Sequence, residues 1–517
     1  MPFVHDWLAT GPVRTRRQVA PAGRNGRQQE RRFLHRYPAA SATVCNSDTV
    51  VCVDTTTVIE SVRQDFEVTL EALEDLVRIP SISASPDHRE AVQKCAEAVA
   101  EHLSTNGLQD VHVIEGYGAH PYVTGECIKH DDAPTVLLYA HHDVQPPGIV
   151  ENWTRDPFEP YRHNGRLFGR GSADDKAGIV AHAAAISAWL GAGGPPCNVK
   201  VLIEGEEEVG SPNLESFLLK HRDRLAADVL VLADAGNWSV GKPGITYLLR
   251  GLVGADVSLR ALEGPVHSGM AGGVVPDPAM GMAVLLASLV DAHGDIAIEG
   301  FWDDVRTPMQ HEIDRVADLP GDPESLREAL GVREDVRLAG HPETSVYERL
   351  WMRPAVTVIG FDSHPVRGSS NQIVSEATAR LSIRLAPGQE PHAALEKLVA
   401  HLEDHAPWGL QLSIDRGETV PAWVCEPTGW AFDAAHKALT AGFETEPVYM
   451  GVGGTIPFVG PFAEAFGGIP ALLMGPADPT SRIHGEDESL HIDDLRRLIE
   501  SEVHLLGEIA ASHPGGT

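Results

Sequence analysis

The sequence lacks any run of about 18 consecutive apolar residues, so it predicts no helix that would span a membrane. It is also poor in cysteine, with six among 517 residues and no CxxC spacing, which argues against a zinc ribbon and a disulfide framework. Basic residues are in the minority, since 41 Lys and Arg stand against 73 Asp and Glu, a formal net charge of −32. Neither a nucleic acid nor an anionic membrane is therefore an expected partner, and reduced thiols favour the cytoplasm.

The first 50 residues differ in composition from the rest of the chain. They contain eight Arg, no Lys and three acidic residues, a net charge of +5, whereas the remainder has 33 basic and 70 acidic residues, a net −37. The segment also lacks the apolar stretch of a secretory signal. We interpret residues 1–58 as a disordered Arg-rich tail. A start codon assigned too far upstream is the preferred explanation, and a transit peptide is the alternative.

Polar side chains follow three apolar runs that we predict to be strands. The runs are residues 135–139, 199–203 and 229–232. Continuous apolar and β-branched runs are typical of buried parallel strands. They lead into His141, Glu204 and Asp234. Because ligands of open α/β sheets bind outside the carboxyl ends of the strands, we expect these side chains to share one edge of a sheet.

The length of the chain exceeds that of one ordinary hydrophobic core, so two or three domains are expected. From about Ile245 the pattern changes to a smaller α+β unit, with a strand of alternating polarity over residues 252–260 and a helix over residues 278–292, and after Cys425 the α/β pattern returns. We therefore predict a second domain inserted into the first. The predicted segments are a catalytic domain at 59–244 and 425–517 and an inserted domain at 245–424, with a charged insertion near 300–350.

Six side chains have the number and chemistry of a two-metal site: His141, Asp174, Glu207, Glu208, Asp234 and His484. Imidazole with carboxylate suits Zn²⁺ or a related first-row ion, and two ions close together need a bridging carboxylate. Taken one at a time, the histidines could be surface residues and the glutamates a solvated acidic loop. The residues alone also leave open which of Glu206, Glu207 and Glu208 would bind metal and which would act as a base.

Five segments in a fixed order resemble the metallopeptidase family M20, in particular its branch of cytosolic nonspecific dipeptidases and carnosinases. The segments are YAHHDVQP, GRGSADDKAG, EGEEEVGS, VHSGMAGG and RIHGEDE, and the resemblance covers about residues 60–513. It implies an α/β fold, a mixed sheet flanked by helices in a zinc-peptidase-like catalytic domain, with an inserted α+β ferredoxin-like dimerisation and lid domain. It also implies metal-dependent hydrolysis of dipeptides beside a free C-terminal carboxylate.

The resemblance assigns a role to each residue of the metal site: His141 and Asp234 to one ion, Glu208 and His484 to the other, and Asp174 as the bridge between them. Asp143 would orient His141, as carboxylates commonly do for metal-binding imidazoles. Glu207 would be the general base for a water activated by two divalent ions. Zn²⁺ is the preferred metal, with Mn²⁺ or Co²⁺ as alternatives. The family pattern also places a non-proline cis peptide bond between Asp174 and Asp175.

The same resemblance assigns further residues to the substrate. His267 would reach across a homodimer into the partner's active site and hydrogen-bond the developing oxyanion. Arg384 would pair with the substrate carboxylate through its planar guanidinium, and Asn371 is a weaker candidate for a substrate contact. The loop formed by Gly453, Gly454 and Thr455 would hold the same carboxylate. A small peptide and a second copy of the chain are therefore the expected partners.

The substrate class is the least defined part of the prediction. Gly451 and Val452 stand where many family members have Arg-Glu, which affects the expected substrate preference and not the hydrolysis. An N-acyl or N-succinyl amino acid amidohydrolase, or a carboxypeptidase, on the same fold is the alternative function. A metal-binding scaffold without activity is a further alternative, which the complete set of ligands and the presence of a base argue against.

Overall fold

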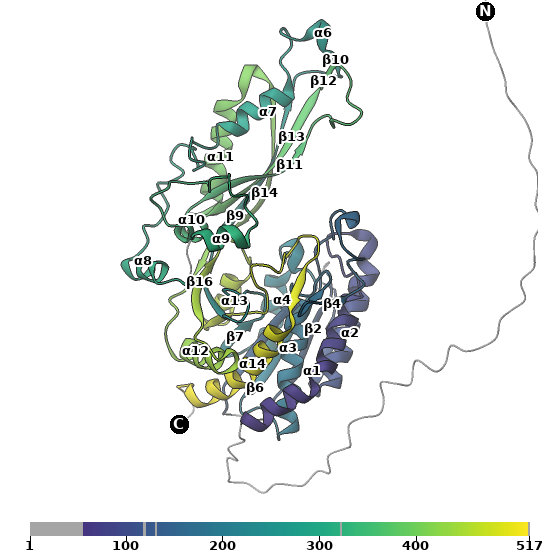
Figure 1. The fold of residues 1–517 in the computed structure, drawn as a ribbon, viewed down its shortest axis with the longest axis vertical. Coiled ribbons are helices and arrows are strands. Elements are labelled where there is room, and N and C mark those ends of the chain that lie inside the picture. Colours follow the sequence, from purple (N-terminus) through teal and green to yellow (C-terminus); the bar gives the residue numbers. More distant parts are fainter. Residues whose placement is uncertain (1–54, 117–119, 130–131, 321–322, 515–517) are drawn as a thin grey trace, which may run out of the picture. The chain divides into compact units, whose positions relative to one another are not determined.

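The computed structural model describes residues 55–116, 120–129, 132–320 and 323–514 (Figure 1). Its main element is a nine-stranded mixed sheet, in which β3 is parallel to both of its neighbours, β6 and β7. In spatial order its strands are β1 (Gln109–Ile114), β2 (Tyr122–Cys127), β6 (Asn198–Glu204), β3 (Thr135–His141), β7 (Val229–Leu232), β17 (Ala471–Leu473), β8 (Gly244–Leu249) and β15 (Trp423–Val424), with β16 (Val448–Val452) also paired to β8.

Helices cover both faces of this sheet. Successive residues of a strand point to opposite sides, so one strand can contribute side chains to the cores on both faces. Val136 and Leu138 of β3 join the core formed with α1 (Thr55–Val77), α2 (Arg89–Thr105), α3 (Lys176–Gly191), α12 (Trp430–Phe443) and α14 (Ile492–Ser512). Leu137 and Tyr139 join a second core formed with α4 (Leu214–Lys220) and α13 (Val459–Ala465). The continuous apolar sequence of β3 is therefore explained by burial on both faces.

A second sheet has a hydrophobic core of its own. Its antiparallel strands, in spatial order, are β11 (Ala355–Asp362), β13 (Glu376–Leu385), β9 (Gly251–Arg260) and β14 (Gln411–Val420). Every second residue of β9 is buried, which confirms the predicted alternation. The buried residues pack with α7 (Pro278–Ala287) and α11 (Pro391–His405), which lie beside this sheet in Figure 1.

Two small sheets and several short elements complete the described structure. β10 (Val266–His267) pairs with β12 (Gln372–Ile373), and β18 (Ser489–His491) pairs with β5 (Arg166–Phe168), which pairs with β4 (Tyr161–His163). The short helices are α5 (Arg222–Leu225), α6 (Ser268–Ala271), α8 (Gln310–Ala317), α9 (Pro323–Ala329) and α10 (Val346–Met352). Across the described ranges, no helix combines the length and the apolar character needed to cross a membrane.

The predicted α/β class with a mixed sheet flanked by helices is confirmed, but some elements differ from the prediction. α1 begins at Thr55, so residues 55–58 of the expected tail are helical, and the rest of that tail lies outside the described residues. A helix was expected to continue to Ala292, but it ends at Ala287 and Val290 forms a β-bridge. β2 and β11 are not among the predicted strands, because β2 contains Gly and Glu and β11 follows the charged insertion.

Candidate metal centre

Three neighbouring strands bring polar side chains to one edge of the main sheet. β3 lies between β6 and β7 and is parallel to both, so their carboxyl ends meet. β3 ends at His141, β7 ends just before Asp234, and β6 is followed by the 3₁₀ turn Glu207–Val209. Asp174 lies in the loop before α3, which begins at Lys176. The expected convergence of strand ends is therefore present in the structure.

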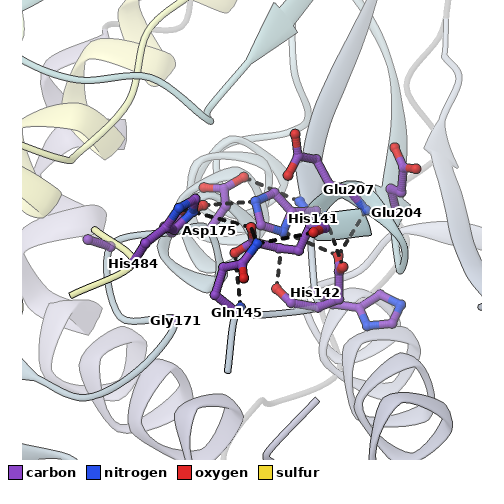
Figure 2. Close-up of polar contacts among 12 residues, drawn as sticks. His141, His142, Gln145, Gly171, Asp175, Glu204, Glu207 and His484 are labelled. Atoms are coloured by element: carbon purple, nitrogen blue, oxygen red, sulfur yellow. Dashed lines mark hydrogen bonds and ion pairs between the residues drawn. The ribbon is translucent and has the colours of Figure 1, made fainter. Parts of the chain in front are cut away.

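Two groups of side chains meet at this edge and share one carboxylate. The ligand atoms of His141, Asp174 and Asp234 lie within 4.8 Å of one another, and so do those of Asp174, Glu208 and His484. The Nε2 atom of His141 lies 2.9 Å from Oδ1 of Asp174. The Nε2 atom of His484 lies 3.1 Å from Oδ2 of Asp174 and 3.2 Å from Oε2 of Glu208 (Figure 2). Asp174 therefore presents a different oxygen to each histidine.

The backbone at the shared aspartate has the geometry that the family resemblance implies. The peptide bond between Asp174 and Asp175 is cis. Burial would raise the pKa of Asp174, but hydrogen bonds from His141 and His484 outweigh burial and lower it. The Asp174 carboxylate is therefore strongly favoured in its charged form, which is the form that a bridging ligand requires.

The remaining carboxylates repel one another in a buried setting. Burial and the charge of Asp174 hold the pKa values of Glu208 and Asp234 above their ordinary range, and burial with neighbouring carboxylates does the same for Glu207. Burial lowers the pKa of His484, but its contacts with Asp174 and Glu208 outweigh burial and raise the pKa to about 11. Such an excess of carboxylate over imidazole attracts cations, and the donor atoms fit first-row divalent ions.

Asp143 connects the end of β3 to the turn that carries two of the glutamates. Its Oδ1 accepts a hydrogen bond from the backbone N–H of Glu207 at 3.2 Å, and its Oδ2 accepts one from the N–H of Glu208 at 3.1 Å. Its Oδ1 also lies 3.4 Å from Nδ1 of His141. Asp143 is fully buried, so it contacts the histidine and the glutamate turn at the same time.

The three consecutive glutamates differ in what holds their carboxylates. Glu206 is buried and accepts hydrogen bonds from the Tyr122 hydroxyl and from the backbone and side-chain N–H groups of Asn213. Glu208 accepts hydrogen bonds from the backbone and side chain of Gln145, at 3.1 and 2.8 Å. Among the described residues we find no hydrogen bond to the carboxylate of Glu207, which lies beside His141 in Figure 2. Glu206 is thus held by β2 and by its own loop, whereas the Glu207 carboxylate has no such contacts among the described residues.

Arg384 and the glycine loop lie together. Nη1 of Arg384 donates to Oγ1 of Thr455 at 2.7 Å, and that hydroxyl donates to the carbonyl oxygen of Arg250 at 2.6 Å. The carbonyl oxygens of Gly453 and Gly454 accept hydrogen bonds from the side chain and the backbone of Arg250, each at 3.1 Å. The structure therefore connects the three predicted loop residues with the predicted carboxylate-binding arginine.

His267 and Asn371 lie near each other at the paired strands β10 and β12. The backbone N–H of Ser268 donates to the carbonyl oxygen of Asn371 at 2.9 Å, and both His267 and Asn371 are exposed. The His267 side chain accepts a hydrogen bond from the N–H of Gly269 at 3.0 Å. The described contacts within one chain do not join His267 to the metal-site residues, so its action from a partner subunit stays a prediction.

Sequence reasoning missed the residues that support the site. Gln145 and Glu488 lie within the segments YAHHDVQP and RIHGEDE, and Arg250 follows β8. For Gln145 and Glu488, their place within these segments was the only indication in the sequence. Their partners lie far away along the chain, so their contacts could not be inferred from local sequence.

Comparisons with known proteins identify the family of the chain. The model of Peptidase family M20/M25/M40 matches residues 137–508. The chain is 32% identical over 441 residues to cysteinylglycine-S-conjugate dipeptidase of Corynebacterium striatum, covering 84% of this chain and 94% of that protein. It is 30% identical over 353 residues to Beta-Ala-His dipeptidase of Homo sapiens, covering 66% of this chain and 69% of that protein.

Solved structures show the same fold. The di-peptidase Dug1p of Saccharomyces cerevisiae superimposes with a TM-score of 0.81 at 23% identity, over 89% of this chain and 99% of that one. Human carnosine dipeptidase 1 superimposes with a TM-score of 0.80 at 26% identity, over 88% of this chain and 99% of that one. The resemblance read from the five segments is thereby confirmed, and the chain belongs to Peptidase family M20/M25/M40.

Proposed function

We propose that this protein is a metal-dependent dipeptidase that hydrolyses the peptide bond next to a free C-terminal carboxylate. The observation that carries the proposal is the pair of three-residue groups that share Asp174, with Glu207 beside them. Two relatives at 32% and 30% identity are named for the cleavage of cysteinylglycine conjugates and of Beta-Ala-His. Both names describe substrates built on a dipeptide, which supports the same substrate class here.

The two groups would each hold one divalent ion, His141 and Asp234 on one side, Glu208 and His484 on the other, and Asp174 on both. Each group combines an imidazole nitrogen with carboxylate oxygens, a donor set that fits Zn²⁺, with Mn²⁺ and Co²⁺ as alternatives. When bound, such ions polarise the scissile carbonyl and lower the pKa of water. Asp143 would fix the position of His141 relative to the turn that carries Glu207 and Glu208.

Glu207 would act first as general base and then as general acid. A carboxylate next to the attacking water can take its proton and deliver it to the nitrogen of the leaving amine. The backbone of Glu207 is held by Asp143, while its carboxylate has no hydrogen-bond partner among the described residues. This combination supports Glu207 over Glu206, whose carboxylate is bound by Tyr122 and Asn213.

Arg384, with Gly453, Gly454 and Thr455, would bind the substrate carboxylate, because a guanidinium and a hydroxyl already meet there. Asn371 and the partner subunit's His267 would complete the site in a homodimer. We assign catalytic segments to 59–244 and 425–517 and the inserted dimerisation and lid domain to 245–424. The separate core beneath β9, α7 and α11 supports that division. The four cysteines in the described residues are free thiols, which supports a reducing compartment such as the cytoplasm.

A substrate panel tests the proposal. Protein stripped of metal and then supplied with Zn²⁺ or Mn²⁺ is assayed on Cys-Gly, β-Ala-His, an unmodified tripeptide, and N-acetyl and N-succinyl amino acids. The expected result is metal-dependent cleavage of dipeptides with the acylated compounds untouched. Cleavage of acylated amino acids alone would replace the dipeptidase assignment by an amidohydrolase, and cleavage of the tripeptide from its C-terminus would indicate a carboxypeptidase.

A further inference from the structure

Glu488 binds the loop that carries the shared aspartate. Its side chain is fully buried, and it lies four residues after His484. Its Oε1 accepts hydrogen bonds from the backbone N–H groups of Ala173 at 3.0 Å and Asp174 at 3.2 Å. Its Oε2 accepts one from the N–H of Gly171 at 3.1 Å. One carboxylate therefore takes three backbone donors from the four residues that end at Asp174.

Arg170 completes this arrangement with a buried ion pair. Its Nη1 donates to Oε2 of Glu488 at 2.6 Å, and the side chain of Arg170 is 1% exposed. Its Nη2 donates to the carbonyl oxygens of Pro146 at 3.3 Å and Gly485 at 3.2 Å. The ion pair thus connects three segments, one after β3, one before α3, and the one that contains His484.

Gly171 allows the loop to lie close to this carboxylate. It has a φ of +81°, and a Cβ added there would lie 2.6 Å from Cγ1 of Val144. The left-handed conformation and the close approach both require glycine. The loop is therefore shaped so that its N–H groups point at Glu488.

We propose that Glu488 is a positioning residue that sets the separation between Asp174 and His484, and through them the affinity of the site for divalent ions. The inference rests on the metal site proposed above. The backbone N–H of Asp174 is bound to Glu488, while the two oxygens of Asp174 face His141 and His484 at 2.9 and 3.1 Å. Residues that orient metal ligands commonly change metal affinity when they are replaced.

A purely structural role would have a different consequence. A buried carboxylate paired with Arg170 would affect the free energy of unfolding wherever it lay in the protein, since removing one partner leaves the other buried and uncompensated. A positioning role predicts in addition that ion binding weakens in molecules that are folded. Metal affinity of the folded protein therefore separates the two roles.

The test uses Glu488→Gln in the full chain, because glutamine keeps the size and one acceptor oxygen but cannot accept with its NH₂. Dissociation constants for Zn²⁺ are measured on metal-stripped protein by competition with a chromophoric chelator, together with urea unfolding, kcat and KM. We expect the dissociation constants of both ions to rise by about 10–100-fold, because Asp174 is shared. At saturating metal we expect kcat to fall and KM to stay within about twofold.

The matched control is Glu502→Gln. Glu502 is also a buried glutamate, and its carboxylate lies 2.8 Å from Nδ1 of His182, a residue outside both metal-site groups. This variant should lose stability and keep the metal affinity of the wild type. An equal loss of metal affinity in both variants would show that general destabilisation is the cause, and it would overturn the proposal.

A second variant covers the case in which Glu488→Gln does not fold. Arg170→Lys keeps a cation beside Glu488 but removes the fork that reaches Pro146 and Gly485, so metal affinity should fall several-fold in a folded protein. Wild-type affinity in whichever variant folds would overturn the positioning role while leaving the proposed function intact. Wild-type protein that binds no divalent ion would instead refute the proposed function itself.

Discussion

The carboxylate of Asp143 accepts a hydrogen bond from the backbone N–H of Glu207 at 3.2 Å. This contact joins the segment after β3 to the turn after β6, and the second oxygen of Asp143 binds the next backbone N–H, that of Glu208. The peptide groups of both glutamates are therefore fixed by one buried side chain. Their side chains differ in their contacts. The Glu208 carboxylate is bound by Gln145, and the Glu207 carboxylate has no hydrogen-bond partner among the described residues.

Replacing Glu207 by Gln should abolish most of the activity and leave metal binding intact. Glutamine cannot take up a proton, so kcat should fall by about 10²–10⁴-fold or more. The measurement is dipeptide hydrolysis at saturating metal, with metal content determined in the same samples. Glu206→Gln is the control from the same turn, and it should keep kcat within about tenfold. An active Glu207→Gln variant would refute the assignment of the base.

Replacing Asp174 by Asn should weaken the binding of both ions, whereas replacing His484 by Ala should weaken the binding of one. The reason is that Asp174 belongs to both three-residue groups and His484 to one. Equilibrium dialysis at a fixed free Zn²⁺ concentration, followed by elemental analysis, gives the number of ions per chain. We expect two for the wild type, about one for His484→Ala and fewer than one for Asp174→Asn. Loss of a single ion in Asp174→Asn would contradict a shared ligand.

Arg384→Gln should raise KM for dipeptides with a smaller effect on kcat. A charge-assisted hydrogen bond to a carboxylate is worth about 1.5–3 kcal/mol, which corresponds to a KM increase of roughly 10–100-fold. Arg380→Gln is a matched control on the same strand, because Arg380 is exposed and pairs with Asp256 at 2.7 Å. Equal KM values in the two variants would remove Arg384 from the carboxylate site.

The variants His267→Ala and Glu207→Gln should each be inactive alone, and activity should return when the two variant proteins are mixed. In a mixed dimer, the subunit with an intact Glu207 would receive an intact His267 from its partner, so one site would be complete. The measurement is activity after the two variants are unfolded, refolded together and compared with each variant refolded alone. Absence of recovery, with mixed dimers demonstrated, would contradict the action of His267 across subunits.

The buried pair of His182 and Glu502 should make stability depend on pH. Burial lowers the pKa of His182, but the charge and hydrogen bond of Glu502 outweigh burial and the pKa is raised. The folded chain therefore binds this proton more tightly than the unfolded chain does. The resulting stabilisation is complete below the unfolded value of about 6.5, and it is lost as pH rises through the folded pKa.

Glu502→Gln should accordingly lower the free energy of unfolding most at acidic pH. We expect a loss of roughly 3 kcal/mol below about pH 6 and a smaller loss in alkaline solution, above the folded pKa of His182. Urea unfolding of both proteins across this range measures the difference. A loss that is the same at every pH would show that His182 carries no extra proton in the folded state.

Sequence patterns were sufficient to predict strands in which the burial of side chains follows a regular pattern. The run from Val136 to Tyr139 is apolar at every position because β3 is covered on both faces, and β9 alternates because one of its faces packs on helices. β2 escaped prediction because its Gly125 and Glu126 interrupt the apolar pattern, although Tyr122 and Val123 are fully buried. Its place in the sheet comes from pairing with β6 and β1, which local sequence does not encode.

The amino-acid sequence by itself determined the chemistry available to this protein, since imidazoles and carboxylates follow apolar strands in the order of a known family. Only the tertiary structure decided which of these groups face one another. It separates Glu206, held by Tyr122, from Glu207, and it brings Glu488 to the backbone of Asp174 across 314 residues of sequence. The physical reason is that strand and helix patterns depend on neighbouring residues, whereas these contacts depend on how distant loops meet at one edge of the sheet.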